Sequence, residues 1–149
     1  MAADERATAT RIPTITRLVK LFIEREGALA AAIRAGDAAK TQDFLSDDFE
    51  MRVGATPATP VPRADWVAEM MRLRNPGDDA REMAVHDLNG AAVVSFIQGS
   101  GQSAIFVVDV WRMAGAEWKL AIRYASAAGT AAFPIPGAAA AQNTIPKKY

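Results

Sequence analysis

The chain has 149 residues, half of them apolar, and its 17 lysines and arginines balance its 17 aspartates and glutamates. This length predicts one domain with a substantial core, and the apolar content excludes extensive disorder. Balanced charge gives no electrostatic basis for binding nucleic acid, no apolar run is long enough to span a membrane, and the lack of cysteine excludes disulfides and thiolate chemistry.

Three further features narrow the class of protein. The opening stretch MAADERATATR is charged and has no apolar centre, so it does not resemble a signal peptide. With the lack of cysteine, this leads us to expect a cytoplasmic protein. His86 is the only histidine of the sequence, which excludes a metal site built from several histidines in one chain. We expect neither a metal nor a cofactor.

The first half of the sequence reads as helical. From Thr14, apolar residues recur at helical spacing as far as Ile33, and Gly36 ends this predicted helix. Asp37 can cap a short second helix that reaches Leu45. The pattern therefore predicts two consecutive helices at the start of the domain.

A strand, a loop and a third helix follow. Residues 49–53 alternate apolar and charged side chains, which predicts a half-exposed strand. The stretch GATPATPVP is predicted to be a loop because it contains three prolines. ADWVAEMMRL, residues 64–73, has the spacing of a third helix.

From residue 82 the apolar period changes to two, which predicts four strands: EMAVHDL, AAVVSFIQ, SAIFVVDVWRM and EWKLAIRYAS. Asn89–Gly90 between the first two is a strong hairpin signal, and strands joined by short turns are antiparallel neighbours. We therefore divide the chain into a flexible arm at residues 1–13, a domain at residues 14–128 and an irregular tail at residues 129–149.

Helices followed by a meander of strands indicate an α+β fold. Two stretches, AIRAGDAAKTQDFLSDDFEMRV and VDVWRMAGAEWKLAIRYAS, resemble the opening and the closing hairpin of the nuclear transport factor 2-like (cystatin-like cone) superfamily, in its ketosteroid isomerase and polyketide cyclase (SnoaL-like) branch. The resemblance implies N-terminal helices packed in the concave face of a curved antiparallel sheet, a cone with one pocket. Because that fold hosts isomerases, dehydratases, cyclases, hydrolases and plain binding modules, it does not settle the function.

Asp109 is a carboxylate in the middle of the apolar strand FVVDVWRM. The resemblance places it where ketosteroid isomerase-like members carry an acid that donates a hydrogen bond to a developing enolate. The same resemblance places the general base at Val53 and the tyrosine near Leu29, and neither residue can transfer a proton. We therefore expect no ketosteroid isomerase activity.

Two interpretations of Asp109 stay open. It is either catalytic or a structural and ligand-anchoring residue paired with an arginine such as Arg123 on the next strand, and the second is favoured because buried acids are commonly paired. His86 could be a base or an exposed strand residue. Tyr124, taken to share a face with Leu120, could line a pocket mouth or pack as a core aromatic.

The resulting prediction is a pocket whose walls combine these polar candidates with apolar side chains. Its lining is predicted to be Asp109, Trp111, Tyr124, His86, Val53, Phe22 and Trp66.

Three functions remain. The first is a binding or orphan module that holds a small apolar or amphipathic molecule beside one acid. The second is a cofactor-free isomerase, dehydratase or cyclase that uses Asp109 with His86 or Tyr124. The third is an assembly subunit that acts through its sheet face.

The strand that contains Asp109 is apolar on both faces, because Val108 and Val110 lie on the face opposite Asp109. We therefore expect a homodimer that covers the outer face.

Overall fold

The structure is a computed structural model of the chain and describes residues 14–77, 79–129 and 132–138. The predicted arm and much of the predicted tail lie outside these residues. In chain order the elements are α2 (Thr14–Arg34), α3 (Ala38–Asp43), β1 (Leu45–Val53), β2 (Val61–Pro62), α4 (Arg63–Leu73), β3 (Arg81–Asp87), β4 (Ala91–Gln98), the short 3-10 helix η1 (Gly101–Ser103), β5 (Ile105–Ala114) and β6 (Glu117–Ala127).

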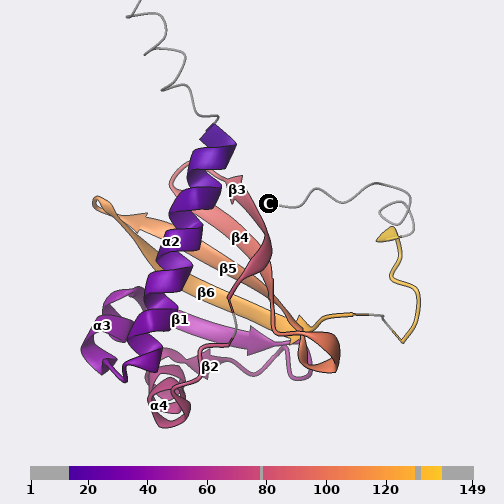
Figure 1. The fold of residues 1–149 in the computed structure, drawn as a ribbon, viewed down its shortest axis with the longest axis horizontal. Helices are drawn as coiled ribbons and strands as arrows, with labels where there is room; N and C mark the ends of the chain where they lie inside the picture. Colours follow the sequence, from indigo (N-terminus) through magenta and orange to yellow (C-terminus); the bar gives the residue numbers. More distant parts are fainter. Residues whose placement is uncertain (1–13, 78, 130–131, 139–149) are drawn as a thin grey trace, which may run out of the picture.

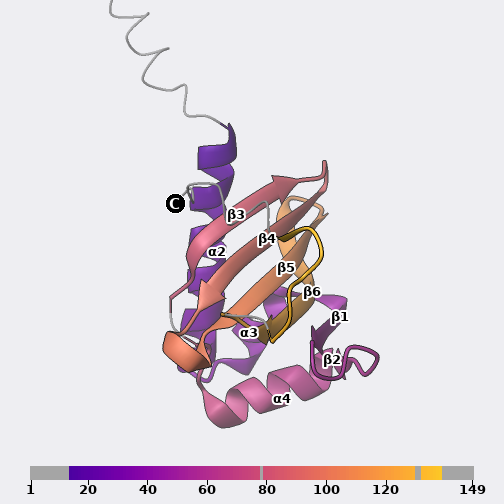
Figure 2. The ribbon, with the colours of Figure 1, turned by 90° about the vertical axis from the view of Figure 1, so that its right-hand side faces the viewer.

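The six strands form one curved, open sheet in the order β2-β1-β6-β5-β4-β3. Figure 1 shows α2 lying across one face of this sheet, and α3 and α4 gathered near β1. Figure 2 shows the same arrangement from the side, with α4 beside β1 and β2. The expected α+β class, with N-terminal helices against one face of a curved sheet, is therefore confirmed. Neighbouring strands are antiparallel except for β1 and β6, which run parallel.

The helix ends follow their local chemistry. Gly36 has a φ of 68°, and the Asp37 backbone N–H donates to Ala32 O at 3.0 Å, which closes α2 with the left-handed turn that glycine favours. The Asp37 side chain then caps α3 by accepting from the Lys40 backbone N–H at 3.0 Å. The predicted Asn89–Gly90 hairpin is also present, with φ values of 59° and 98°.

Two boundaries differ from the prediction. β1 begins at Leu45, because Leu45 pairs with Leu120 of β6 and the register then shifts before Glu50. Within the predicted loop GATPATPVP, Val61 and Pro62 pair with β1. A proline is tolerated there because β2 is the edge strand of the sheet.

The core lies between α2 and the inner face of the sheet. Phe22 of α2 is fully buried, and its ring centroid lies 5.7 Å from that of Trp111 on β5. At the α4 side, the Phe49 and Trp66 rings meet edge to face at 5.0 Å. These aromatic contacts fill the interior of the cone with side chains.

Candidate functional site

A buried acid–arginine–acid cluster lies inside the cone, between α2, β5 and β6. Arg123 of β6 donates two hydrogen bonds to Asp109 of β5, from Nε to Oδ1 and from Nη2 to Oδ2, both at 2.8 Å. The same Nη2 lies 3.2 Å from Glu26 Oε2 of α2, and the Trp111 indole Nε1–H donates to Glu26 Oε1 at 3.0 Å. Asp109 is 0 % exposed, Glu26 7 % and Arg123 8 %. The structure thus shows the pairing with Arg123 that the structural interpretation of Asp109 predicted.

The charges of this cluster do not cancel if both acids are ionised. Burial raises the pKa of Glu26 well above its ordinary value, and the neighbouring Asp109 carboxylate raises that pKa further. Burial would lower the pKa of Arg123, but Asp109 and Glu26 raise it above its ordinary value. A neutral Glu26 beside an Asp109–Arg123 ion pair leaves no net charge in the interior. This distribution of charge avoids an uncompensated buried carboxylate.

The bidentate contact defines what Asp109 can do. Both of its oxygens accept hydrogen bonds from a guanidinium that carries a positive charge, which is the geometry of an ionised carboxylate. In this arrangement both Asp109 oxygens accept hydrogen bonds from Arg123, whereas the isomerase resemblance implies a donor at this position.

The residues of the predicted pocket lie in two different places. Asp109, Trp111, Phe22 and Trp66 are buried on the inner side of the sheet, each no more than 2 % exposed. The other three members do not belong to this group.

Tyr124, His86 and Val53 lie away from the interior cluster. Tyr124 pairs with Val108, which points to the face opposite Asp109, and it is 43 % exposed. His86 is exposed and pairs with Val93 on that same outer face. Val53 and Tyr124 both line a groove on the outer face. The enzyme alternative requires Asp109 to lie beside His86 or Tyr124. The structure places these two residues on the face opposite Asp109, so they do not meet it.

A cavity of about 400 Å³ lies beside Glu26, at the α2–β3 side of the molecule. Its walls come from α2, from the stretch before β3 and from the end of β4: Ile23, Glu26, Gly27, Ala30, Asp79, Ala80 and Gln98. Its size is that of a small-molecule site, with a few polar groups among small apolar ones. Glu26 thus connects the interior cluster to a cavity.

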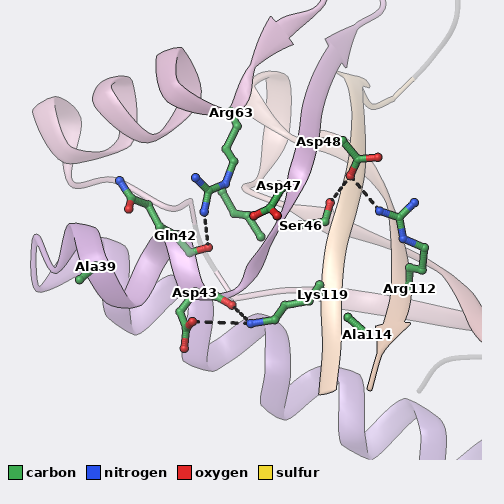
Figure 3. Close-up of a pocket in the computed structure, with 11 residues that line it drawn as sticks. Ala39, Gln42, Asp43, Ser46, Asp47, Asp48, Arg63, Arg112, Ala114 and Lys119 are labelled. Carbon is green, nitrogen blue, oxygen red and sulfur yellow. Dashed lines mark hydrogen bonds and ion pairs between the residues drawn. The ribbon is translucent and has the colours of Figure 1, made fainter. Parts of the chain in front are cut away.

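A larger cavity of about 540 Å³ lies between α3, α4 and the β1–β6 pair, and Figure 3 shows its charged lining. Here several charged side chains pair with one another. Arg112 pairs with Asp48 at 2.8 Å, Ser46 Oγ donates to Asp48 Oδ1 at 2.8 Å, and Lys119 binds Asp43. The Ser46 hydrogen bond and Arg112 lower the pKa of Asp48. Most of these charged groups are exposed, whereas the cavity beside Glu26 has a buried carboxyl in its wall, so the cavity beside Glu26 is the better candidate.

Glu26 is the residue that sequence reasoning missed. It lies four residues after Phe22 and three before Leu29, on the stripe of α2 that packs inward. An acid on an otherwise apolar stripe is the available signal, and it points to a paired or protonated group.

No protein-family model matches the chain, and no curated protein is significantly similar to it. Comparison with solved structures shows that the chain has the nuclear transport factor 2-like, cystatin-like cone fold. A nuclear transport factor 2-like protein from Cytophaga hutchinsonii matches with a TM-score of 0.61 and 15 % identity over 73 % of this chain and 97 % of that one. A nuclear transport factor 2-like protein of unknown function from Silicibacter pomeroyi matches with a TM-score of 0.62 and 8 % identity. The match covers 77 % of this chain and 99 % of that one.

A third similar structure is the CaMKII hub of S. rosetta, with a TM-score of 0.59 and 18 % identity over 73 % of this chain and 95 % of that one. At these identities the likeness shows the fold, and the fold hosts many functions. Among the helices described, none is both long and apolar enough to cross a membrane.

Proposed function

We propose that the protein binds a small amphipathic molecule in the cavity beside Glu26. The observation that carries this proposal is a buried carboxyl with a raised pKa at the wall of a cavity of about 400 Å³. Most of the remaining wall is small or apolar, from Gly27, Ala30 and Ala80. Such a site offers a place for an apolar body and a hydrogen-bonding position near its inner end.

The polar groups of the cavity limit the ligand class. Glu26 in its protonated form and Gln98, which is 8 % exposed, favour a neutral hydroxyl, ketone or amide. Asp79 lies at the cavity with an exposed side chain, which disfavours an anion. We therefore propose a neutral, amphipathic ligand.

Gly27 allows a direct test of this site. An added Cβ at Gly27 meets nothing within 4 Å, so there is room for a side chain to start at this position of the cavity wall, and Gly27→Leu is the substitution chosen to fill it. We expect neutral fragments with hydroxyl, ketone or amide groups to shift the backbone amide NMR signals of Ala30 and Ala80 in the parent protein. Gly27→Leu should abolish these shifts, because its side chain takes the ligand's volume.

The matched control is Gly27→Ala, which changes the helix but adds one carbon only. It should keep fragment binding and gain about 0.5–1 kcal/mol of stability from its higher helix propensity. Fragments that bind Gly27→Leu as tightly as the parent protein would place the ligand site elsewhere, and a library without hits would argue against a binding role.

We also propose a homodimer through the outer face of β4, β5 and β6. Its support is an apolar surface on that face, formed by Val93, Phe106, Val108, Val110, Ile122 and Tyr124. Phe106 and Tyr124 are 39 % and 43 % exposed, which is typical of a surface that meets another chain.

A cytoplasmic location stays a prediction from the lack of cysteine.

Val110→Lys tests the dimer. A charge at the centre of the apolar surface should convert a dimer into a monomer of 15.9 kDa, because the interface would have to bury an unpaired ammonium. Light scattering measures this mass directly. Leu88→Lys, at an exposed residue on the β3–β4 hairpin, should leave the dimer intact. A parent protein that is already monomeric would refute the dimer.

A further inference from the structure

The outer face carries an apolar groove at one corner of the sheet. Its volume is about 270 Å³, and its lining includes Val53, Phe106, Val108 and Tyr124. Val108 and Tyr124 are cross-strand partners on β5 and β6, so they form its floor together. We call this site the outer groove.

The same chain carries an exposed apolar segment. After β6 the sequence continues to Phe-Pro-Ile-Pro, Phe133–Pro136, which we call the tail segment (yellow in Figure 1). Its two large side chains are uncovered: Phe133 is 71 % exposed and Ile135 59 %. The groove and the segment are both apolar, and neither covers the other within one chain.

The composition of the tail segment favours docking into such a groove. Each proline fixes its own φ and restricts the residue before it to extended conformations, so the segment is pre-organised as a polyproline II strand. Grooves lined by aromatic side chains bind segments of this kind because little conformational entropy is lost. Phe106 and Tyr124 are the aromatic side chains of the outer groove.

The tail starts at the corner of the sheet that carries the groove. The Ala128 backbone N–H donates to Ala104 O at 2.9 Å, which fixes the start of the tail at the corner that carries the groove. Ser126 itself lines the groove. The described lining of the groove includes no residue of the tail segment, so in a two-fold dimer over the outer face the groove stays free for the partner's tail.

We infer that the tail segment of one copy binds the outer groove of a second copy, in a reciprocal exchange. This inference rests on the proposed homodimer and adds the element that covers the groove. It assigns an interaction role to a stretch outside the predicted domain.

The absence of cysteine makes the inference directly testable. A disulfide needs Cβ atoms about 3.5–4.5 Å apart, so cross-linking reports close contact. Val108→Cys places a thiol in the groove, and Ile135→Cys places one on the tail segment. Mixing the two variants under mild oxidation should give a disulfide-linked species with twice the mass of 15.9 kDa, which reductant returns to monomers on a denaturing gel.

Three controls separate the alternatives. Each single variant alone should give far less linked dimer than the mixture. Leu88→Cys, on the β3–β4 hairpin at the far end of β5 from the groove, should not link to Ile135→Cys. In the double variant Val108→Cys/Ile135→Cys, exchange predicts links between chains.

Each other outcome has a definite meaning. A double variant that links within one chain and stays monomeric would show that the tail fills its own groove, which overturns the exchange. If the parent protein is dimeric by light scattering but the mixture of the two cysteine variants gives no link, the exchange is overturned and the dimer is left standing. A monomeric parent protein together with an unlinked mixture of the two variants would refute both.

Discussion

Arg123→Met is expected to lower the free energy of unfolding by about 3–5 kcal/mol, because it leaves the fully buried Asp109 carboxylate without its cation. Methionine keeps much of the arginine volume, so packing against Trp66, whose ring lies 5.7 Å from the guanidinium carbon, is largely preserved. The loss is therefore electrostatic rather than a cavity effect. Urea denaturation followed by circular dichroism measures it.

Arg112→Met is the matched control. Arg112 also forms a 2.8 Å ion pair, with Asp48, but the two side chains are 52 % and 70 % exposed. Exposed pairs contribute about 1 kcal/mol at most. Similar losses in the two variants would mean that burial of the Arg123 cluster has no particular importance.

Asp109→Asn is expected to have the second largest effect, a loss of about 1.5–3 kcal/mol from its charge-assisted hydrogen bonds. The loss should be smaller than for Arg123→Met because Glu26 can ionise and replace Asp109 as the anion beside Arg123. The variant should also change how stability depends on pH, and this change identifies the mechanism.

The sign of that dependence follows from the raised pKa of Glu26. In the parent protein the folded state holds a proton that an unfolded glutamate, with its ordinary pKa of 4.5, releases. The contribution of this proton to stability is complete below that ordinary pKa and is lost as the pH rises through the folded pKa, by up to about 1.4 kcal/mol per pH unit. In Asp109→Asn the repulsion from Asp109 is lost while burial still raises the pKa of Glu26, so this decline should become shallower.

Urea midpoints measured from about pH 5 to about pH 8 compare the two proteins. The expected result is a parent protein that loses stability with rising pH more steeply than Asp109→Asn does. Parallel curves for the two proteins would show that Asp109 does not hold a proton on Glu26.

The order and type of the main elements could be predicted from sequence because each depends on local signals. Gly36 and Asp37 mark a helix end and a helix start, and Asn89–Gly90 fixes a hairpin. The inward direction of Asp109 also follows from strand alternation. What could not be predicted depends on contacts far apart in the sequence, such as the one between Glu26 and Arg123, which are separated by 97 residues.

Tyr124 lies on the opposite face of the sheet from the one predicted, and the cause is local. Along β6, strict alternation puts Tyr124 on the same face as Leu120, and this was the basis of the prediction. The structure has a register shift in which Val110 pairs with Ile122 but Trp111 pairs with Leu120, so one extra residue enters β6. An inserted residue reverses the faces of everything beyond it. Leu120 is therefore fully buried, whereas Tyr124 points outward.

The protonation of Glu26 is the most direct test of the buried cluster and of the ligand site that borders it. Carbon-13 NMR can follow the side-chain carboxyl of Glu26 as the pH is varied, and Glu26→Gln identifies its signal by removing it. The raised pKa predicts a titration midpoint well above the ordinary glutamate value of 4.5, because burial and the Asp109 carboxylate both disfavour a second buried anion. A midpoint at or below 4.5 would show that Glu26 is ionised beside Arg123, and it would remove the neutral carboxyl on which the proposed ligand class depends.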